Sequence, residues 1–315
     1  MTKTAFIFPG ESSHSVGMMS AMADNFDIVR DAFEEASEVL GYDLWAVTAD
    51  GPDTKLDKAE VKKPAMLVAG IATWRVWQQL GGARPDFFAG HGLGEYTALV
   101  ATGVLEFTDA VSIVAQRGHY MQQAIPPGGG AMAAVWGLDD IIMREICSRV
   151  ENGEIVSCAH YNTPGQVVIS GNREAVEEAG ELTLQAGAKR VELLPVSIPS
   201  HCLLMKPAAI KLQELLWTVH FSDSSIPVIQ NADVRVYLDA EQIREALARQ
   251  LWQPVRWTET ILTLLESGVS RFIECGPGGV LSEINRVISP DATVFSLVGK
   301  DVMYEALQME NSNEQ

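Results

Sequence analysis

The sequence has few cysteines and no long apolar run. Its four cysteines are widely spaced and form no C-x-x-C pair, so neither a redox motif nor a thiolate metal site is indicated. No apolar stretch reaches the roughly 18–20 residues that cross a bilayer. The first residues, Met-Thr-Lys-Thr-Ala-Phe-Ile-Phe, do not have the pattern of a signal peptide. We therefore expect reduced thiols in a cytoplasmic protein that has no membrane contact.

Basic residues are also scarce, since 23 Lys and Arg stand against 41 Asp and Glu, for a net charge of −18. This balance argues against general nucleic-acid binding and against an anionic membrane surface. An acidic partner would need a local basic patch. The basic residues that we expect to form it are Lys189, Arg190, Lys206, Arg249, Arg256 and Arg286.

Metal and nucleotide motifs are missing as well. The three glycines at 128–130 lack both the Walker lysine and G-x-G-x-x-G spacing, so we interpret them as a hinge. The histidines show no spacing typical of metal ligands, so no metal site is expected; they are His14, His91, His119, His160, His201 and His220.

A length of 315 residues with 47% hydrophobic content is sufficient for a large core. Strand patterns at 4–8, 226–229 and 271–274 alternate with helical patterns, which favours a parallel doubly wound sheet. The helices that we expect in this part lie at 27–40, 64–80, 94–102, 109–124, 205–217, 240–250 and 258–267, with a short one after residue 301.

The order changes between residues 128 and 199. Here we expect strand 131–136, helix 139–150, strands 154–159 and 166–170, helix 172–186 and strand 188–194. This βαββαβ order is ferredoxin-like. The sequence thus predicts an α/β-hydrolase-like domain (1–127 and 200–315) with an inserted ferredoxin-like subdomain (128–199).

Residues 87–96 have the outline of a nucleophile elbow that lacks its nucleophile. In the pattern G-x-S-x-G, a serine lies on a sharp turn between strand and helix, and the next N–H faces the developing oxyanion. The sequence at 90–94 is Gly-His-Gly-Leu-Gly, so Gly92 occupies the serine position. Glycine has only a hydrogen atom in place of a side chain, so residue 92 cannot act as a nucleophile on an acyl group such as a thioester.

The elbow makes two residues distant in sequence, His201 and Arg117, candidates for the same site. A histidine base is expected late in such a chain, and His201 follows a strand that ends at Pro199. Asn231 or nearby backbone would orient its other ring nitrogen, whereas the adjacent Cys202 is interpreted as structural. Arg117, in the middle of a predicted helix, has the planar fork that binds a carboxylate through two hydrogen bonds.

These residues lie within a series of motifs that resembles the malonyl-CoA:acyl carrier protein transacylases of bacterial fatty acid synthesis and their relatives in polyketide synthesis. The similarity runs almost from end to end. The motifs that carry it are Phe-Ile-Phe-Pro-Gly at 6–10, Gly-Tyr-Asp-Leu-Trp at 41–45, Gly-His-x-Leu-Gly-Glu-Tyr at 90–96, Gln-Arg-Gly at 116–118, Gly-Ala-Met-Ala-Ala at 130–134, Asn-Thr-Pro-Gly-Gln-Val-Val-Ile-Ser-Gly at 162–171, Pro-Ser-His-Cys at 199–202, Gln-Leu-x-x-Pro-Val-x-Trp at 250–257 and Gly-Pro-Gly at 276–278.

The resemblance implies a two-step transfer in which a serine takes an acyl group from coenzyme A and passes it to carrier-protein phosphopantetheine. It implies that His201 is the base, that Arg117 binds the malonyl carboxylate and that Gln250 supports the site. The oxyanion would be held by the N–H groups of Leu93 and Glu11, and we count His91 among the substrate-binding residues. No permanent cofactor is implied.

The sequence departs from the family where its chemistry lies. The family has serine at the position of Gly92, glutamine at that of Glu11 and usually glutamine at that of Lys63. We expect Glu11 and Lys63 to form an ion pair that holds the first loop and changes the electric field at the oxyanion site. A carboxylate there would oppose a developing negative charge.

Several functions remain open. The chain is expected to bind acyl thioesters or acyl carrier protein without an acyl-serine, and we expect a monomer. The alternatives are a hydrolase or one-step acyltransferase that uses His201 or Glu11 to activate a nucleophile, a non-catalytic scaffold that binds a carrier protein, and an active transacylase that carries an engineered glycine at position 92.

Overall fold

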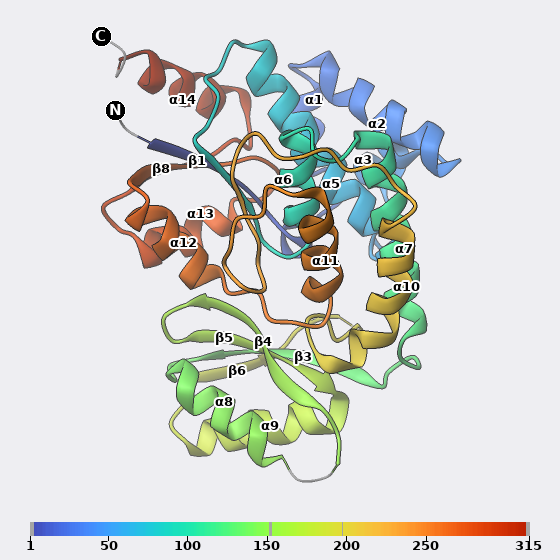
Figure 1. Ribbon diagram of the computed structural model, residues 1–315, viewed down its shortest axis with the longest axis vertical. Coiled ribbons are helices and arrows are strands. Elements are labelled where there is room, and N and C mark those ends of the chain that lie inside the picture. Colours follow the sequence, from blue (N-terminus) through green and yellow to red (C-terminus); the bar gives the residue numbers. More distant parts are fainter. Residues whose placement is uncertain (1–2, 151–152, 197, 313–315) are drawn as a thin grey trace.

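The computed structural model describes residues 3–150, 153–196 and 198–312, and these residues form two sheets (Figure 1). The larger sheet is parallel throughout and has the strand order β7-β2-β1-β8-β9. Its strands are β1 (Lys3–Phe8), β2 (Phe87–Gly90), β7 (Val228–Ile229), β8 (Val269–Glu274) and β9 (Thr293–Ser296). The predicted parallel α/β sheet is confirmed.

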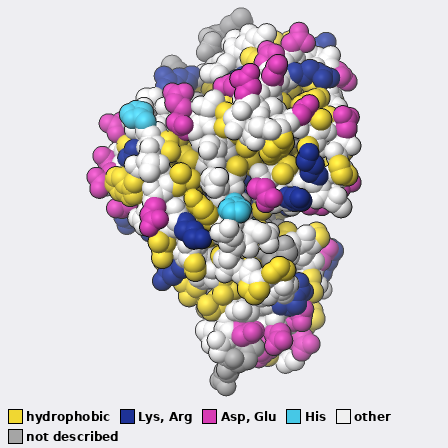
Figure 2. Space-filling view, turned by 90° about the vertical axis from the view of Figure 1, so that its right-hand side faces the viewer, with side chains coloured by type: hydrophobic (Ala, Val, Ile, Leu, Met, Phe, Trp, Pro, Cys, Tyr) yellow, Lys and Arg dark blue, Asp and Glu magenta, His cyan; other side chains and the backbone are white. Residues whose placement is uncertain are grey.

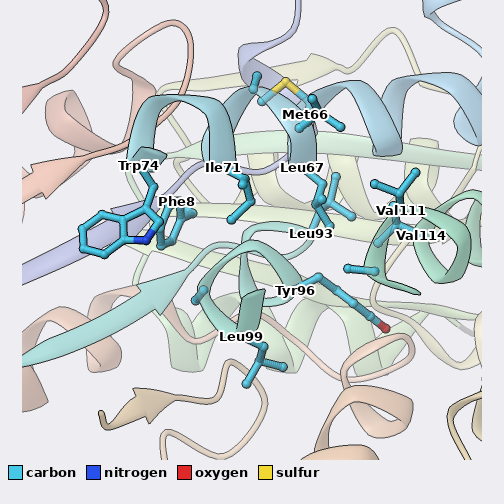
Figure 3. Close-up of a cluster of buried hydrophobic side chains, with 14 of the residues drawn as sticks. Phe8, Met66, Leu67, Ile71, Trp74, Leu93, Tyr96, Leu99, Val111 and Val114 are labelled. Carbon is cyan, nitrogen blue, oxygen red and sulfur yellow. The ribbon is translucent and has the colours of Figure 1, made fainter. Parts of the chain in front are cut away.

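The central strand β1 is apolar on both faces because helices cover both sides of the sheet. Phe6 and Phe8 face one core, where Phe6 packs edge-on against Trp74 at 5.1 Å between ring centroids. Ile7 faces a second core together with Trp257. The first core continues from α5 across Phe8 to the helix that follows the elbow (Figure 3). This packing fixes the carboxyl end of β1 beside that of β2.

The helices agree closely with the predicted ranges, with one exception at α5. The first core is covered mainly by α2 (Asp27–Leu40), α5 (Ala59–Gln79), α6 (Gly94–Ala101) and α7 (Phe107–Gln123), and the second by α12 (Trp257–Glu266) and α13 (Val280–Ile288). The remaining helical elements are η1 (Glu11–Ser13), α1 (Ser20–Ala23), α3 (Leu44–Asp50), α4 (Asp53–Leu56), η2 (Leu203–Met205), α10 (Lys206–Leu216), α11 (Ala240–Gln250) and α14 (Lys300–Ser312). No helix within the described ranges is long and apolar enough to span a membrane.

The prediction that a helix begins at Pro64 was wrong, because α5 begins at Ala59. Proline has no N–H and leaves one carbonyl of the preceding turn without its helical partner. That turn is nevertheless well buried, since Val61, Lys62 and Lys63 are each less than 10% exposed, at 5%, 8% and 1%. Burial therefore outweighs one missing hydrogen bond, and Lys63 lies inside a helix rather than in the loop before it.

The smaller sheet is antiparallel and has the order β4-β5-β3-β6. It consists of β3 (Gly130–Trp136), β4 (Val156–Thr163), β5 (Gln166–Asn172) and β6 (Arg190–Leu193), with α8 (Asp140–Arg149) and α9 (Arg173–Gln185) on its outer face (Figure 1). This is the order of a ferredoxin-like βαββαβ unit. Its strand β4 is joined to the larger body through Tyr161 N–H and Val255, at 2.9 Å.

The turn between β2 and α6 depends on two glycines. A Cβ on Gly90 would lie 1.9 Å from the carbonyl carbon of Gly94, and a Cβ on Gly94 would lie 2.1 Å from the carbonyl oxygen of Phe8. Both distances are far shorter than any real contact, so no other residue type fits here. The N–H of His91 also donates to Phe8 at 2.9 Å, which ties the turn to β1.

We predict that Gly90→Ala lowers the free energy of unfolding by about 3 kcal/mol or more, because the added methyl group must displace backbone atoms. Gly299→Ala is the matched control, since a Cβ there meets nothing within 4 Å and the change should stay within about 0.5 kcal/mol. Urea denaturation followed by circular dichroism measures both. Equal stability of the two variants would contradict this account of the turn.

Candidate active site

Gly92 lies at the centre of the elbow in a left-handed conformation, with φ at +55°. A Cβ built on it would lie 3.4 Å from Nε2 of His201, which is the nearest atom outside the turn. A side chain at position 92 would therefore point at the imidazole. The arrangement is that of a nucleophile elbow whose central side chain is missing.

His201 is held as a neutral base. Its Nδ1 lies 2.8 Å from the carbonyl oxygen of Gln250 and 3.2 Å from that of Gln253. Carbonyl oxygens only accept, so Nδ1 carries the proton and Nε2 presents a lone pair toward Gly92. Burial, assisted by the positive charge of Arg117, lowers the pKa of His201 to about 3. The ring is thus uncharged at neutral pH.

Of the two groups expected to orient His201, the backbone is the one observed. The imidazole is oriented by the carbonyl oxygens of Gln250, the last residue of α11, and of Gln253, whereas Asn231 braces the elbow itself. Its Oδ1 accepts from Gly92 N–H and its Nδ2 donates to the Gly90 carbonyl, each at 2.6 Å. Asn231 is buried, so both of its side-chain hydrogen bonds are shielded from water. It fixes the turn rather than the base.

Gln250 links the elbow to Arg117. Its Nε2 donates to the Gly92 carbonyl at 2.7 Å, and its Oε1 accepts from Arg117 Nη2 at 3.3 Å. Arg117 is only 1% exposed, yet its Nε and Nη1 have no hydrogen-bond partner among the described residues. A buried guanidinium with open donors is suited to receive an anionic group.

Two backbone N–H groups are open at the same place. Leu93 precedes the first residue of α6, and Glu11 begins η1. The N–H groups at helix starts have no partner inside the helix, and neither of these donates to another described residue. The side chain of Leu93 is turned into the core (Figure 3). Two free donors near Gly92 are what a developing oxyanion requires.

The expected ion pair between Glu11 and Lys63 is present, with Oε1 and Nζ 2.6 Å apart. The same Oε1 lies 3.8 Å from Nη1 of Arg117, a contact that the sequence did not predict. Although burial opposes it, the charges of Lys63 and Arg117 lower the pKa of Glu11 to about 2. Glu11 is therefore ionised throughout the physiological range.

Two further histidines, His91 and His160, lie beside His201 in a row of three imidazole rings. His91 Nε2 donates to Asn162 Oδ1 at 2.9 Å, and burial lowers the pKa of the ring. His160 lies between the two other imidazoles, with ring centroids 5.0 Å from His91 and 5.1 Å from His201. Burial and these neighbours hold the pKa of His160 well below its ordinary value.

The sequence analysis missed His160 as a site residue. Regular alternation along β4 would place it on the face of Cys158, in the outer core of the small sheet. The register between β4 and β5 shifts between Cys158 and His160, and such bulges redirect side chains beside active sites. A bulge leaves little trace in a single sequence, so only the nearby Asn-Thr-Pro-Gly motif at 162–165 indicated this region.

The six basic residues do not form one patch. Lys206 and Arg249 line a groove of about 430 Å³ between α10 and α11, whereas Lys189 lines another groove. Arg190 and Arg256 each pair with a glutamate, namely Glu192 and Glu259. On the face over α7 and α10, basic and acidic side chains are interspersed (Figure 2). The expectation of a single docking patch is therefore wrong.

The parallel sheet, the elbow and the imidazole that faces it define this chain as a member of an acyl-transfer class. Residues 5–301 match the acyl transferase domain family. The malonyl CoA-acyl carrier protein transacylase of Salmonella typhimurium is 50% identical over 297 residues, which cover 94% of this chain and 96% of that protein. The corresponding Escherichia coli K12 protein is 48% identical over 98% of this chain and 100% of its own length.

The fold of this chain is similar over almost its whole length to that of a solved structure. A malonyl-transacylase in complex with a type II PKS acyl-carrier protein superposes with a TM-score of 0.97 at 46% identity, covering 98% of this chain and 100% of that one. The chain belongs to the malonyl-CoA–acyl carrier protein transacylase family. The predicted resemblance is confirmed at the level of the family.

Glu95, in the first turn of α6 directly after the elbow, has a fully buried carboxyl group. Its Oε2 accepts from the Asn231 N–H at 2.7 Å. Burial raises the pKa of Glu95 from 4.5 to about 8. Between these two values the folded chain retains a proton that the unfolded chain releases, so this group stabilises the fold less as pH rises.

We predict that Glu95→Gln changes the pH dependence of stability. The free energy of unfolding of the unchanged protein, relative to the variant, should decrease from pH 5 to pH 8. The reason is that glutamate at position 95 titrates in this window, whereas glutamine does not. Urea denaturation at both pH values measures the difference. Glu38→Gln, at an exposed position on α2, is the control, and parallel curves for the unchanged protein and Glu95→Gln would refute the prediction.

Proposed function

We propose that this chain binds malonyl thioesters of coenzyme A and of an acyl carrier protein without forming an acyl-serine. The observation that carries the proposal is the geometry at Gly92. The elbow is complete in its conformation, its bracing hydrogen bonds and its facing base, yet it has no hydroxyl group. Two-step transfer through a covalent serine ester has no nucleophile here.

Open hydrogen-bond donors around Gly92 support the binding of such a thioester. The carbonyl oxygen would lie between the N–H groups of Leu93 and Glu11, and the terminal carboxylate would occupy the open donors of Arg117. Gln250 would hold Arg117 and the elbow in a fixed relation. Coenzyme A or phosphopantetheine would arrive as part of the substrate, so we propose no permanent cofactor.

Our proposal for the pathway and the partner is supported by the relatives. Because a neighbour of 46% identity was solved with a type II PKS acyl-carrier protein, we propose an acyl carrier protein as the partner. The setting would be fatty acid or polyketide biosynthesis in the cytoplasm, with this chain as a monomer.

We predict that labelled malonyl-CoA leaves no covalent label on the protein after denaturing electrophoresis, although it binds reversibly in calorimetry. Gly92→Ser should become labelled, because its Cβ would lie 3.4 Å from His201 Nε2. A left-handed serine costs about 1 kcal/mol of stability, which the fold should tolerate. Label on the unchanged protein would refute the proposal.

Further variants test the rest of the site. Gly92→Ser combined with His201→Ala should lose most of the label, because the serine then has no base. Gly92→Ser combined with Glu11→Gln and Lys63→Gln should be labelled faster than Gly92→Ser alone, if the carboxylate of Glu11 opposes the oxyanion. Equal rates would refute that part of the hypothesis and would favour the view of a transacylase that lacks only its serine.

One observation favours a second function, thioester hydrolysis. The lone pair of His201 Nε2 faces the space that a serine side chain would fill, and His160 adjoins the same ring. A water molecule there would attack the thioester carbonyl carbon and pass its proton to Nε2. The oxyanion would be held by Leu93 and Glu11, the C–S bond would break, and the imidazolium would return the proton to the thiolate.

If hydrolysis occurs, malonyl-CoA should release free malonate, and His201→Ala should lower this rate by about 100-fold or more. His119→Ala is the control, because His119 is an exposed histidine on α7. Release can be followed by thiol titration together with chromatography of the acid. Turnover that His201→Ala does not change would exclude His201 as the base, whereas the absence of any released malonate would leave reversible binding alone.

A further inference from the structure

Three charged side chains from separate elements meet beside the elbow. Glu11 comes from η1, Lys63 from α5 and Arg117 from α7. The carboxylate of Glu11 lies 2.6 Å from Lys63 Nζ and 3.8 Å from Arg117 Nη1. It is hydrogen-bonded to the lysine and only near the arginine, so the contact with Lys63 determines where the carboxylate lies.

Arg117, whose guanidinium lies 5.7 Å from the ring centroid of Tyr96, makes few close hydrogen bonds in the described chain. Only its Nη2 is hydrogen-bonded, to Gln250, while Nε and Nη1 are buried without a partner in the described chain. A buried charge with unsatisfied donors is costly. Glu11 is the carboxylate beside it, and 28% of its side chain is exposed, so it has room to shift toward the guanidinium.

We propose that Lys63 holds Glu11 away from Arg117, so that Arg117 remains open to the terminal carboxylate of an acyl group. When Lys63 carries no charge, Glu11 moves onto Arg117 and becomes an internal competitor of that carboxylate. This inference rests on the proposed binding of malonyl thioesters. It makes Lys63 a positioning residue for acyl selectivity rather than a catalytic one.

The charges agree with this arrangement. Lys63 and Glu11 compensate one another, so the positive charge of Arg117 remains to be matched by a substrate carboxylate. Lys63 is 1% exposed and has no other carboxylate bonded to it in the described structure. The other charge that acts on both partners is Lys62, which lies next to Lys63 in sequence and is not bonded to Glu11.

A pH dependence follows from this charge balance. Burial lowers the pKa of Lys63 to about 8, although Glu11 acts in the opposite direction. As pH rises through this value Lys63 loses its charge, while Glu11 and Arg117 keep theirs. Binding of a carboxylated acyl group should therefore weaken above about pH 8, and binding of a neutral acyl group should not.

The test compares malonyl-CoA with acetyl-CoA, which share every group except the terminal carboxylate. Titration calorimetry at pH 7 gives the ratio of their dissociation constants. Lys63→Gln should reduce the preference for malonyl-CoA about tenfold or more, because one released charge acts at close range in a poorly solvated site. Lys63→Gln combined with Glu11→Gln should regain the preference, because the internal competitor is then gone.

Two further variants sharpen the result. Glu11→Gln alone should keep a preference for malonyl-CoA at pH 7 that is at least as strong as that of the unchanged protein, because no internal carboxylate can then reach Arg117. Lys58→Gln removes the same charge from an exposed position just before α5 and should change neither ligand. Thermal unfolding of each variant confirms that the protein is folded before binding is compared.

The outcomes separate this inference from the function on which it rests. If Arg117→Ala leaves the preference for malonyl-CoA unchanged, the proposed function itself fails. If Arg117→Ala removes the preference but Lys63→Gln weakens both ligands equally, Lys63 has only a structural role and the inference is overturned. Failure of the double variant to regain the preference would overturn it as well.

Discussion

The close approach of the elbow to β1 is the constraint on which the site depends. Gly94 lies so near the carbonyl oxygen of Phe8 that a Cβ would fall 2.1 Å from it. This contact places the start of α6 against the carboxyl end of β1, where the first loop and Glu11 begin. Leu93 and Glu11, whose N–H groups are open among the described residues, therefore follow two backbone segments that touch, since a Cβ on Gly10 would also lie only 2.9 Å from the carbonyl oxygen of His91.

Features of the sequence that arise from local patterns were predicted well, and features that arise from tertiary contacts were not. The parallel sheet and the βαββαβ order follow from apolar periodicity and turn residues, which act within a few positions. The start of α5 was wrong because burial of Val61 and Lys63 outweighs the proline signal. The roles of Asn231 and His160 were missed because they depend on a long-range hydrogen bond and on a β-bulge.

The pairing of Glu11 with Lys63 was predictable, whereas its relation to Arg117 was not. Glu11 and Lys63 stand where the family has two neutral glutamines, and they carry opposite charges. The sum of the charges at these two positions is therefore zero in both cases. The distance of 3.8 Å to Arg117 depends on how α7 packs beside α5, which no local pattern reveals. A charge-neutral exchange thus keeps the net charge of a site while it changes the local field and the groups that lie beside the arginine.

The conformation of the elbow at position 92 does not depend on a side chain at that position. The conformation at position 92 is held by bonds to its backbone, since its N–H is bound by Asn231 and its carbonyl by Gln250. Both hydrogen bonds join the backbone of residue 92, so neither depends on which side chain the residue has. A serine with φ near +55° would be strained, and glycine adopts that conformation freely. Because Asn231 and Gln250 hold the backbone of Gly92, a different side chain at position 92 would leave these hydrogen bonds in place.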